Sequence, residues 1–220
     1  MISVIIPTLN NSETLAPCLA ALIPAAVDGL IRQVIIADGG STDATSAIAE
    51  SAGAEIVSAP PPRADRLIAG AAAAKQPWLM FLTPDGVLAH DWEREVDAHL
   101  EALSANGAAR PAAAVFRFAI DDRGAAPRAA ELATRIGYRV LGRACSEQGL
   151  LISRTHYDQL GGFRAQSAVE DIDLIRRIGR RDLVRLRTPI TIAVSRYQHG
   201  YGRVAARHAT RMLRSLIPGT

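Results

Sequence analysis

The sequence predicts a single α/β domain built on a mixed, mainly parallel sheet with helices on its faces. Short apolar runs recur along the first half of the chain, each ends in a polar or proline-containing loop, and a helical segment follows most of these loops. Parallel strands joined by helices are buried on both faces, so their sequences are apolar throughout rather than alternating. The composition agrees with a folded domain, because 49% of the 220 residues are hydrophobic and 21% are charged.

Four apolar runs in the first half are predicted to be buried strands. They cover residues 2–6, 33–37, 55–58 and 78–82. Helices are predicted between them, at residues 12–22, 43–52 and 63–75. Asn11 or Ser12 is a suitable cap for the first helix, and Leu15, Leu19 and Leu22 follow at helical spacing. Strands that alternate with helices in this way predict right-handed parallel crossovers.

The second half of the chain is less regular. Strands are predicted at residues 113–120 and 149–153, with one or two more within 182–194. Helices are predicted at residues 91–103, 131–141, 170–179 and 204–216. We therefore divide the single domain into residues 1–109, residues 110–195 and a basic C-terminal helix within residues 196–220.

Charge is distributed unequally between the two halves. Residues 1–109 contain 5 basic and 13 acidic residues, whereas residues 110–220 contain 20 arginines and 9 acidic residues. A guanidinium group can donate two parallel hydrogen bonds to the oxygens of one phosphate or carboxylate, so the second half suits anionic partners. The alternative is that most of these arginines lie on solvated surfaces.

The sequence argues against several classes of protein. No run approaches the roughly 18 apolar residues of a membrane span, and Cys18 and Cys145 are too few for a disulfide scaffold. Because no basic segment precedes an apolar run at the N-terminus, we expect no signal peptide and a cytoplasmic protein. Neither a G-x-G-x-x-G nor a P-loop motif is present, which argues against a nicotinamide-dependent dehydrogenase and an NTPase.

Polar residues follow three of the predicted strands, where ligands bind in open α/β sheets. Thr8 and Asn10 follow the first strand, Asp38 and Gly39 the second, and Asp85 the fourth. A carboxylate such as Asp38 can accept hydrogen bonds from a base or a ribose hydroxyl, and Asp85 can hold a hard divalent cation. The residues alone leave a second interpretation open, in which Asp38 caps a helix and Asp85 is an ordinary turn residue.

Glu170 and Asp171 stand at a predicted helix start. A carboxylate there can act as a general base that takes a proton from an attacking hydroxyl. The helix dipole alone also favours acidic residues at this position, so the pattern leaves both interpretations open.

Six motifs together resemble those of family 2 glycosyltransferases with the GT-A fold. In order, they are residues 3–10 (SVIIPTLN), 34–43 (VIIADGGSTD), 81–85 (FLTPD), 145–149 (CSEQG), 160–163 (LGGF) and 170–174 (EDIDL). The third is similar to the HAD-type metal motif of a bacterial subgroup. The resemblance covers about residues 2–195, and six motifs in the family's order are more specific than any one of them.

The resemblance implies a sugar transfer from a nucleotide-diphosphate donor, a UDP- or GDP-sugar, with inversion at the anomeric carbon. It implies that residues 1–109 bind the donor, chiefly through Pro7, Thr8, Asn10, Asp38, Gly39, Arg63 and Asp85. Asp85 is also the implied ligand of Mg²⁺ or Mn²⁺ on the diphosphate. Residues 110–195 would supply the base, Asp171 with Glu170 beside it. The same half would supply an acceptor side formed by Glu147, Gln148, Gly161 and Gly162.

The chain departs from the family pattern at several positions. Thr83 occupies the first position of the metal motif, Glu147 replaces an aspartate, and Arg66 and Ile68 stand where the subgroup has glutamine and asparagine. These departures motivate an alternative hypothesis, a catalytically weak or inactive nucleotide-binding regulatory protein on the same fold. A nucleotidyltransferase is disfavoured, because residues 7–13 contain neither glycine nor a cation for a triphosphate.

The C-terminal segment 203–216 is a basic amphipathic stretch. Arg203, Arg207, Arg211 and Arg214 fall on one face of the predicted helix. Packing against the sheet with these arginines in solvent is one interpretation. The other is peripheral docking on an anionic membrane at its inner face, which would suit a lipid-linked acceptor, although the sequence leaves the acceptor open. We expect no nucleic-acid partner, because no recognition module accompanies the arginines.

Overall fold

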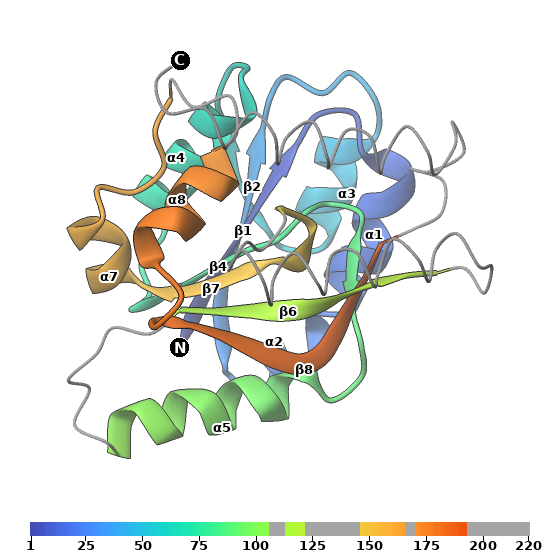
Figure 1. The fold of residues 1–220 in the computed structure, drawn as a ribbon. Helices are drawn as coiled ribbons and strands as arrows, with labels where there is room; N and C mark the ends of the chain where they lie inside the picture. Colours follow the sequence, from blue (N-terminus) through green and yellow to red (C-terminus); the bar gives the residue numbers. More distant parts are fainter. Residues whose placement is uncertain (106–112, 122–145, 166–169, 193–220) are drawn as a thin grey trace.

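The computed structural model describes residues 1–105, 113–121, 146–165 and 170–192. These residues form an eight-stranded mixed sheet with the strand order β3-β2-β1-β4-β7-β6-β8-β5 (Figure 1). The strands are β1 (Ile2–Thr8), β2 (Ile31–Asp38), β3 (Glu55–Ser58), β4 (Trp78–Phe81), β5 (Gly86–Leu88), β6 (Ala113–Ile120), β7 (Leu150–Ser153) and β8 (Leu183–Ile192). The helices are α1 (Ser12–Ala20), α2 (Ile23–Val27), α3 (Thr45–Ser51), α4 (Arg63–Ala73), α5 (Trp92–Ala105), the 3₁₀ turn η1 (Ser146–Gln148), α7 (Arg154–Gln159) and α8 (Glu170–Ile178).

The first four strands are parallel, as the sequence predicts. β1 pairs with β2 on one side and with β4 on the other, so that Ile5 lies opposite both Ile35 and Phe81. Every residue of β1 is buried, because helices cover both faces of this part of the sheet. Burial on two faces explains why the run carries no alternating polar positions.

The second half adds strands of both directions. β7 runs antiparallel to β4, with Leu150 opposite Phe81, and β6 runs antiparallel to β7. β8 pairs with β6 in parallel and with the short strand β5 in the antiparallel sense.

The predicted helices at 131–141 and 204–216 lie outside the described residues. β5 and α7 were not predicted, because three residues carry no periodicity and α7 has only six residues.

Two hydrophobic layers hold the helices to the sheet. One face packs against α1, α2, α3 and α5, and the other against α4, α7 and α8 (Figure 1). The predicted helix at 12–22 is divided, because α1 ends at Ala20 and α2 starts afresh with Pro24 in its first turn. Proline lacks the N–H that a continuous helix would need there.

α4 lies directly on β1 and depends on a glycine to do so. A Cβ atom on Gly70 would lie 2.4 Å from Cγ2 of the fully buried Ile5. In the exposed interior of a helix, alanine in place of glycine would stabilise the protein by about 1 kcal/mol. Here the collision with a strand that is packed on both faces outweighs that gain.

Gly70→Ala is therefore expected to destabilise the protein by about 1–3 kcal/mol, the usual cost of overpacking a core. Chemical denaturation of the variant and of the wild type measures the difference. Ala72→Gly, on the exposed side of the same helix, reports the propensity effect alone. A Gly70→Ala protein as stable as the wild type would show that α4 does not rest on Ile5.

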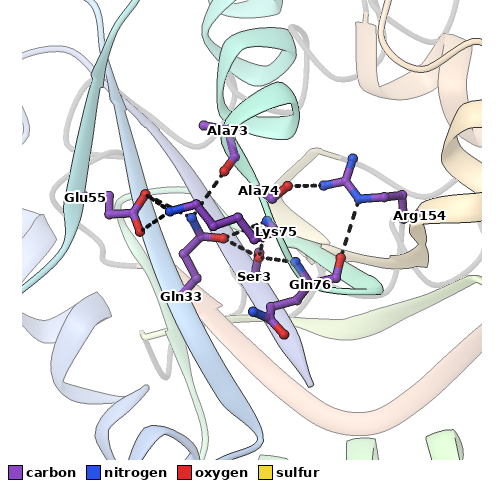
Figure 2. A network of polar contacts seen from close by, with 8 residues as sticks. All are labelled: Ser3, Gln33, Glu55, Ala73, Ala74, Lys75, Gln76 and Arg154. Carbon is purple, nitrogen blue, oxygen red and sulfur yellow. Dashed lines mark hydrogen bonds and ion pairs between the residues drawn. The ribbon is translucent and has the colours of Figure 1, made fainter.

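A buried polar network joins the amino-terminal ends of β1 and β2 to the end of α4 (Figure 2). The Ser3 hydroxyl donates to Gln33 Oε1 at 2.6 Å, and the backbone N–H of Lys75 donates to the same oxygen at 2.8 Å. The Gln33 amide donates to Glu55, and Arg154 donates to the last carbonyls of α4. These bonds satisfy buried polar groups at the edge opposite the polar strand ends, so we assign them to the fold.

Candidate functional site

The three predicted polar strand ends meet at one edge of the sheet. Thr8 ends β1 and Asp38 ends β2, where the two residues are directly paired, and the turn that contains Asp85 follows β4. β1 lies between β2 and β4. The chain therefore adds β2 and β3 on one side of β1 and β4 on the other side. This is the switch point at which open α/β sheets form a ligand crevice. α4 begins at the same edge with Arg63, because β3 ends beside Asp38.

The second half of the chain reaches the same edge through β7. Because β7 is antiparallel to β4, its first residues lie beside the last residues of β4. Glu147 and Gln148, which precede it in η1, are both buried, and the Gln148 amide donates to the Phe116 carbonyl at 3.0 Å. Gly149 has a φ of 64°, and a Cβ on it would lie 3.0 Å from a Leu82 methyl group, so glycine is favoured at this approach. The predicted acceptor-side residues Glu147 and Gln148 thus lie next to the Asp85 turn.

Hydrogen bonds join the loop after β1 to the loop after β2. The Asn10 side chain accepts from the backbone N–H of Thr42, and the Asn10 N–H donates to the Ser41 hydroxyl. Asp43 accepts from the N–H of Ser12, so an acid from the second loop caps α1. The predicted side-chain cap from Asn11 or Ser12 was wrong, because the Asn11 amide oxygen accepts from Leu9 instead.

The Asp38 carboxylate is fully used within these loops. One oxygen accepts from the hydroxyls of Thr8 and Ser41 at 2.8 and 2.5 Å, and the other from the N–H groups of Gly40 and Ser41 at 2.9 and 2.7 Å. Burial raises the pKa of Asp38, but these hydrogen bonds outweigh it and lower the pKa. A carboxylate offers about four acceptor positions, so the protein itself fills those of Asp38.

The space beside Gly39 is filled by an arginine. The Arg66 guanidinium donates to the Thr8 carbonyl at 2.6 Å, and a Cβ on Gly39 would lie 2.7 Å from its Nη1. Arg66 is only 9% exposed, although it carries a charge. The structure thus places the Arg66 guanidinium on the Cβ side of Gly39.

Asp85 is a buried carboxylate in the turn that follows β4. It is 6% exposed, and Thr83 in the same turn is 3% exposed. The N–H of Gly86 donates to the Thr83 carbonyl, which also accepts from the Cys18 thiol. Burial, with the nearby Asp85 charge as a second cause, raises the pKa of Cys18 to about 12, so this thiol stays protonated and unreactive.

The donor set at this turn fits a weakly held divalent cation. Among the described residues no group of three acidic, histidine or cysteine side chains can hold a metal. One buried carboxylate in the turn after a strand can still bind Mg²⁺ or Mn²⁺ when a diphosphate and water supply the other oxygens. The Thr83 hydroxyl, which has no hydrogen-bond partner among the described residues, is a further oxygen in the same turn.

The Gly161-Gly162-Phe163 turn is held against the end of β4. Both glycines have positive φ, and a Cβ on Gly162 would lie 2.9 Å from the Tyr157 ring. Phe163 packs edge-on against Phe81 with ring centroids 4.9 Å apart, and its N–H donates to the Tyr157 hydroxyl. Gly161 and Gly162 are thereby brought close to the carboxyl end of β4.

An arginine of α8 fixes this turn from the other side. Arg177 donates to the Gly162 carbonyl at 2.7 Å, to the Leu160 carbonyl, and to Asp173 at 2.7 Å. Sequence reasoning did not single out Arg177 or Asp173. Their i, i+4 spacing was the available signal, but it indicates only an ordinary helix pair.

Glu170 and Asp171 form the first turn of α8, as predicted. Their side chains lie outside the part of the chain that the structure describes. Leu174 and Ile175 of the same helix pack on the face of the sheet that contains Phe81. The role of the two acids therefore stays a prediction.

A curled α/β sheet with polar strand ends at its switch point defines an open α/β protein with a ligand site at the carboxyl ends of its strands. The family model for glycosyl transferase family 2 matches residues 3–141. The chain therefore belongs to glycosyl transferase family 2, and its architecture is that of the GT-A fold.

Comparisons with known proteins point to one group of enzymes. Over 57 residues the chain is 42% identical to the glucosyl-3-phosphoglycerate synthases of Mycolicibacterium paratuberculosis and Mycobacterium tuberculosis. The matched stretch is 26% of this chain and 17% of those proteins, so the chain covers less than a fifth of the curated relatives it matches.

Solved structures extend the similarity over most of the fold. The Mycobacterium tuberculosis glucosyl-3-phosphoglycerate synthase in complex with Mn²⁺, UDP and glucosyl-3-phosphoglycerate matches with a TM-score of 0.61 at 24% identity, over 87% of this chain and 70% of that chain. The same enzyme in complex with phosphoglyceric acid matches with a TM-score of 0.61 at 25% identity over the same shares of the two chains. Within the described residues, none of the helices combines the length and hydrophobicity needed to cross a bilayer.

Proposed function

We propose that the chain is a metal-dependent glycosyltransferase that uses a UDP-sugar and inverts the anomeric centre. One observation carries the proposal. In a chain that belongs to family 2, Thr8, Asp38, Asp85 and Glu147 gather at one edge of the sheet from four separate segments. The related synthase, crystallised with Mn²⁺ and UDP-glucose, supports UDP-glucose as the first donor to test.

In this proposal the clamped loops after β1 and β2 shape the nucleoside side of the crevice. Asp38 stays ionised and accepts from the hydroxyls of Thr8 and Ser41, so it fixes the two loops that would border the nucleotide. Pro7 lies in β1 near this edge, and Arg63, at the start of α4, would supply a cation for the diphosphate.

Asp85, with the Thr83 hydroxyl beside it, would hold Mg²⁺ or Mn²⁺ together with the diphosphate. When bound, the cation supplies charge stabilisation for the departing nucleoside diphosphate. The buried position of Asp85 excludes bulk water, which strengthens its attraction for a cation.

The acceptor side would be formed by Glu147, Gln148 and the Gly161-Gly162 turn. Asp171, with Glu170 as its neighbour, would remove the proton from the acceptor hydroxyl as that oxygen attacks the sugar carbon. Arg177 joins the helix that carries these acids to the Gly162 turn, so acceptor and base are positioned by one element.

We further propose an anionic acceptor that carries phosphate or carboxylate. The excess of arginine in residues 110–220 supports it, and so does the related synthase in complex with phosphoglyceric acid. Arginine pairs with such oxygens bidentately. A lipid-linked acceptor at the membrane, with contact through 203–216, is the alternative.

Incubation of the purified protein with radiolabelled UDP-glucose and Mn²⁺ tests the function. We expect labelled glucose on 3-phosphoglycerate and little on glycerol, which has the hydroxyls without the anionic groups. Release of UDP in the absence of an acceptor would support UDP-glucose as the donor, but it would not support the proposed acceptor. Metal-dependent UDP binding with neither transfer nor donor hydrolysis would favour the regulatory protein that Thr83, Arg66 and Ile68 suggest.

A further inference from the structure

Three successive backbone N–H groups of the loop after β1 donate to side chains of the loop after β2. The N–H groups at the start of a helix have no partner within that helix, so they need acceptors from elsewhere. Here the second loop supplies those acceptors. The three bonds, which we call the inter-loop clasp, run from Asn10 to the Ser41 hydroxyl at 2.9 Å, from Asn11 to the Thr45 hydroxyl at 2.8 Å and from Ser12 to Asp43 Oδ2 at 3.0 Å.

Asp43 is the charged member of the inter-loop clasp. Its Oδ1 accepts from the N–H of Thr45 at 3.0 Å and from the Thr45 hydroxyl, which itself accepts from Asn11. The Thr45 hydroxyl, and then the Ser12 N–H, hold the pKa of Asp43 well below its usual value, so the carboxylate is ionised at neutral pH. Hydrogen bonds to an ionised acceptor are about twice as strong as those between neutral groups. Asp43 therefore joins the starts of α1 and α3 and supports two of the three bonds of the clasp.

The inter-loop clasp lies at the edge of the sheet where the nucleoside side of the crevice is proposed. Thr8 and Asp38, the last residues of β1 and β2, are paired with each other and directly precede the two loops. A loop that must be ordered when a ligand binds lowers the affinity, because the freedom that it loses is subtracted from the interaction energy. A loop that is already held in one shape avoids that cost.

We propose that Asp43 is a positioning residue for donor binding, which holds the loop after β1 in one shape before the nucleotide arrives. Asp43 acts through the N–H of Ser12 and, by way of Thr45, through that of Asn11. It touches none of the reacting atoms, so it should change the affinity for the donor rather than the rate of sugar transfer. This inference rests on the proposed function, because it assumes that the loop borders a nucleoside diphosphate.

Isothermal titration with UDP in the presence of Mn²⁺ tests the inference on the wild type, Asp43→Asn and Glu50→Gln. Asparagine keeps the shape and one acceptor oxygen, but it loses the charge and turns an amide group toward a donor. In Asp43→Asn we expect the Kd for UDP and the KM for UDP-glucose to rise about fivefold, while kcat stays within about twofold of the wild type. Glu50→Gln removes an exposed acidic charge from α3 and should change neither quantity.

Amide hydrogen exchange of the protein without nucleotide gives a readout that a change in overall stability would not reproduce. In Asp43→Asn we expect the amides of residues 10–12 to exchange faster, and those of residues 4–6 in β1 to stay as protected as in the wild type. Thr45→Val removes the buried hydroxyl that accepts from Asn11 and donates to Asp43, so it should weaken UDP binding too. The double variant should bind UDP less weakly than the two single effects combined would give, because both side chains act on one loop.

Other outcomes would overturn the inference. A lower melting temperature of Asp43→Asn with unchanged UDP affinity would show that Asp43 only caps the two helices. A fall in kcat with unchanged KM would place its effect on the chemical step instead. Absence of UDP binding to the wild type would contradict the proposed function, whereas UDP binding that both Asp43→Asn and Thr45→Val retain in full would overturn this inference alone. Circular dichroism shows whether each variant is folded.

Discussion

Replacement of Asp85 by asparagine is expected to reduce sugar transfer by about 10³-fold and to abolish the Mn²⁺-dependent part of UDP binding. Asp85 is buried and is the sole carboxylate of its turn, and Thr83 offers only a neutral hydroxyl. The amide has the same shape but no charge, so a divalent cation would keep only neutral protein ligands. Steady-state rates and UDP titrations with and without Mn²⁺ measure both effects.

Asp91→Asn is the matched control for loss of an acidic charge nearby in the sequence. Asp91 pairs with His90 and Arg94 and has positive φ, which asparagine tolerates. It should leave transfer and metal dependence unchanged. If UDP binding to Asp85→Asn still strengthened with Mn²⁺ as in the wild type, Asp85 would not be the metal ligand.

Arg177→Met is expected to destabilise the protein by about 2–4 kcal/mol. The side chains of Arg177 and Asp173 are 16% and 27% exposed. Methionine keeps much of the volume, but it leaves the Asp173 carboxylate and the carbonyls of Leu160 and Gly162 without this donor. A partly buried charge that loses its partner costs more than a surface ion pair contributes.

Urea denaturation of Arg177→Met, Asp173→Asn and the double variant measures this loss and the coupling between the two residues. Arg176→Met changes the neighbouring, exposed arginine and should alter stability by no more than about 0.5 kcal/mol. Equal stability of the Arg176 and Arg177 variants would show that the bonds to the Gly161-Gly162 turn contribute little. Because that turn lies on the proposed acceptor side, Arg177→Met should also raise the acceptor KM more than it lowers kcat.

Much of the fold could be predicted from local pattern. The apolar run of β1 and the polar residues after β1, β2 and β4 fall where the sequence placed them. The strand at Ala113–Ile120 and the helix that begins at Glu170 also match. A strand that is buried on both faces must be apolar throughout, and the loops at the edge of the sheet where ligands bind favour polar residues. Both patterns can therefore be read within a short segment of sequence.

The failures have a different origin. Asn11 looked like a side-chain cap, yet Asp43 performs that task from a loop 31 residues away. Thr8, one of the hydrogen-bond partners of Asp38, comes from a separate strand, and Arg66, the neighbour of Gly39, comes from α4. Nothing in a local window indicates which distant donor will reach a given acceptor.

The sequence by itself determined the alternation of strands and helices from β1 to β4, the burial of β1 and the edge at which polar side chains collect, because these follow from the spacing of apolar and polar residues along one segment. Only the tertiary structure decided that Asp38 is occupied by its own loops, that Arg66 fills the space beside Gly39 and that Arg177 holds the Gly162 turn. The contacts of Thr8 with Asp38, of Arg66 with Gly39 and of Arg177 with Gly162 join segments that are separated along the chain. Such contacts depend on how parallel and antiparallel strands bring those segments together, which the spacing of residues within one segment does not specify.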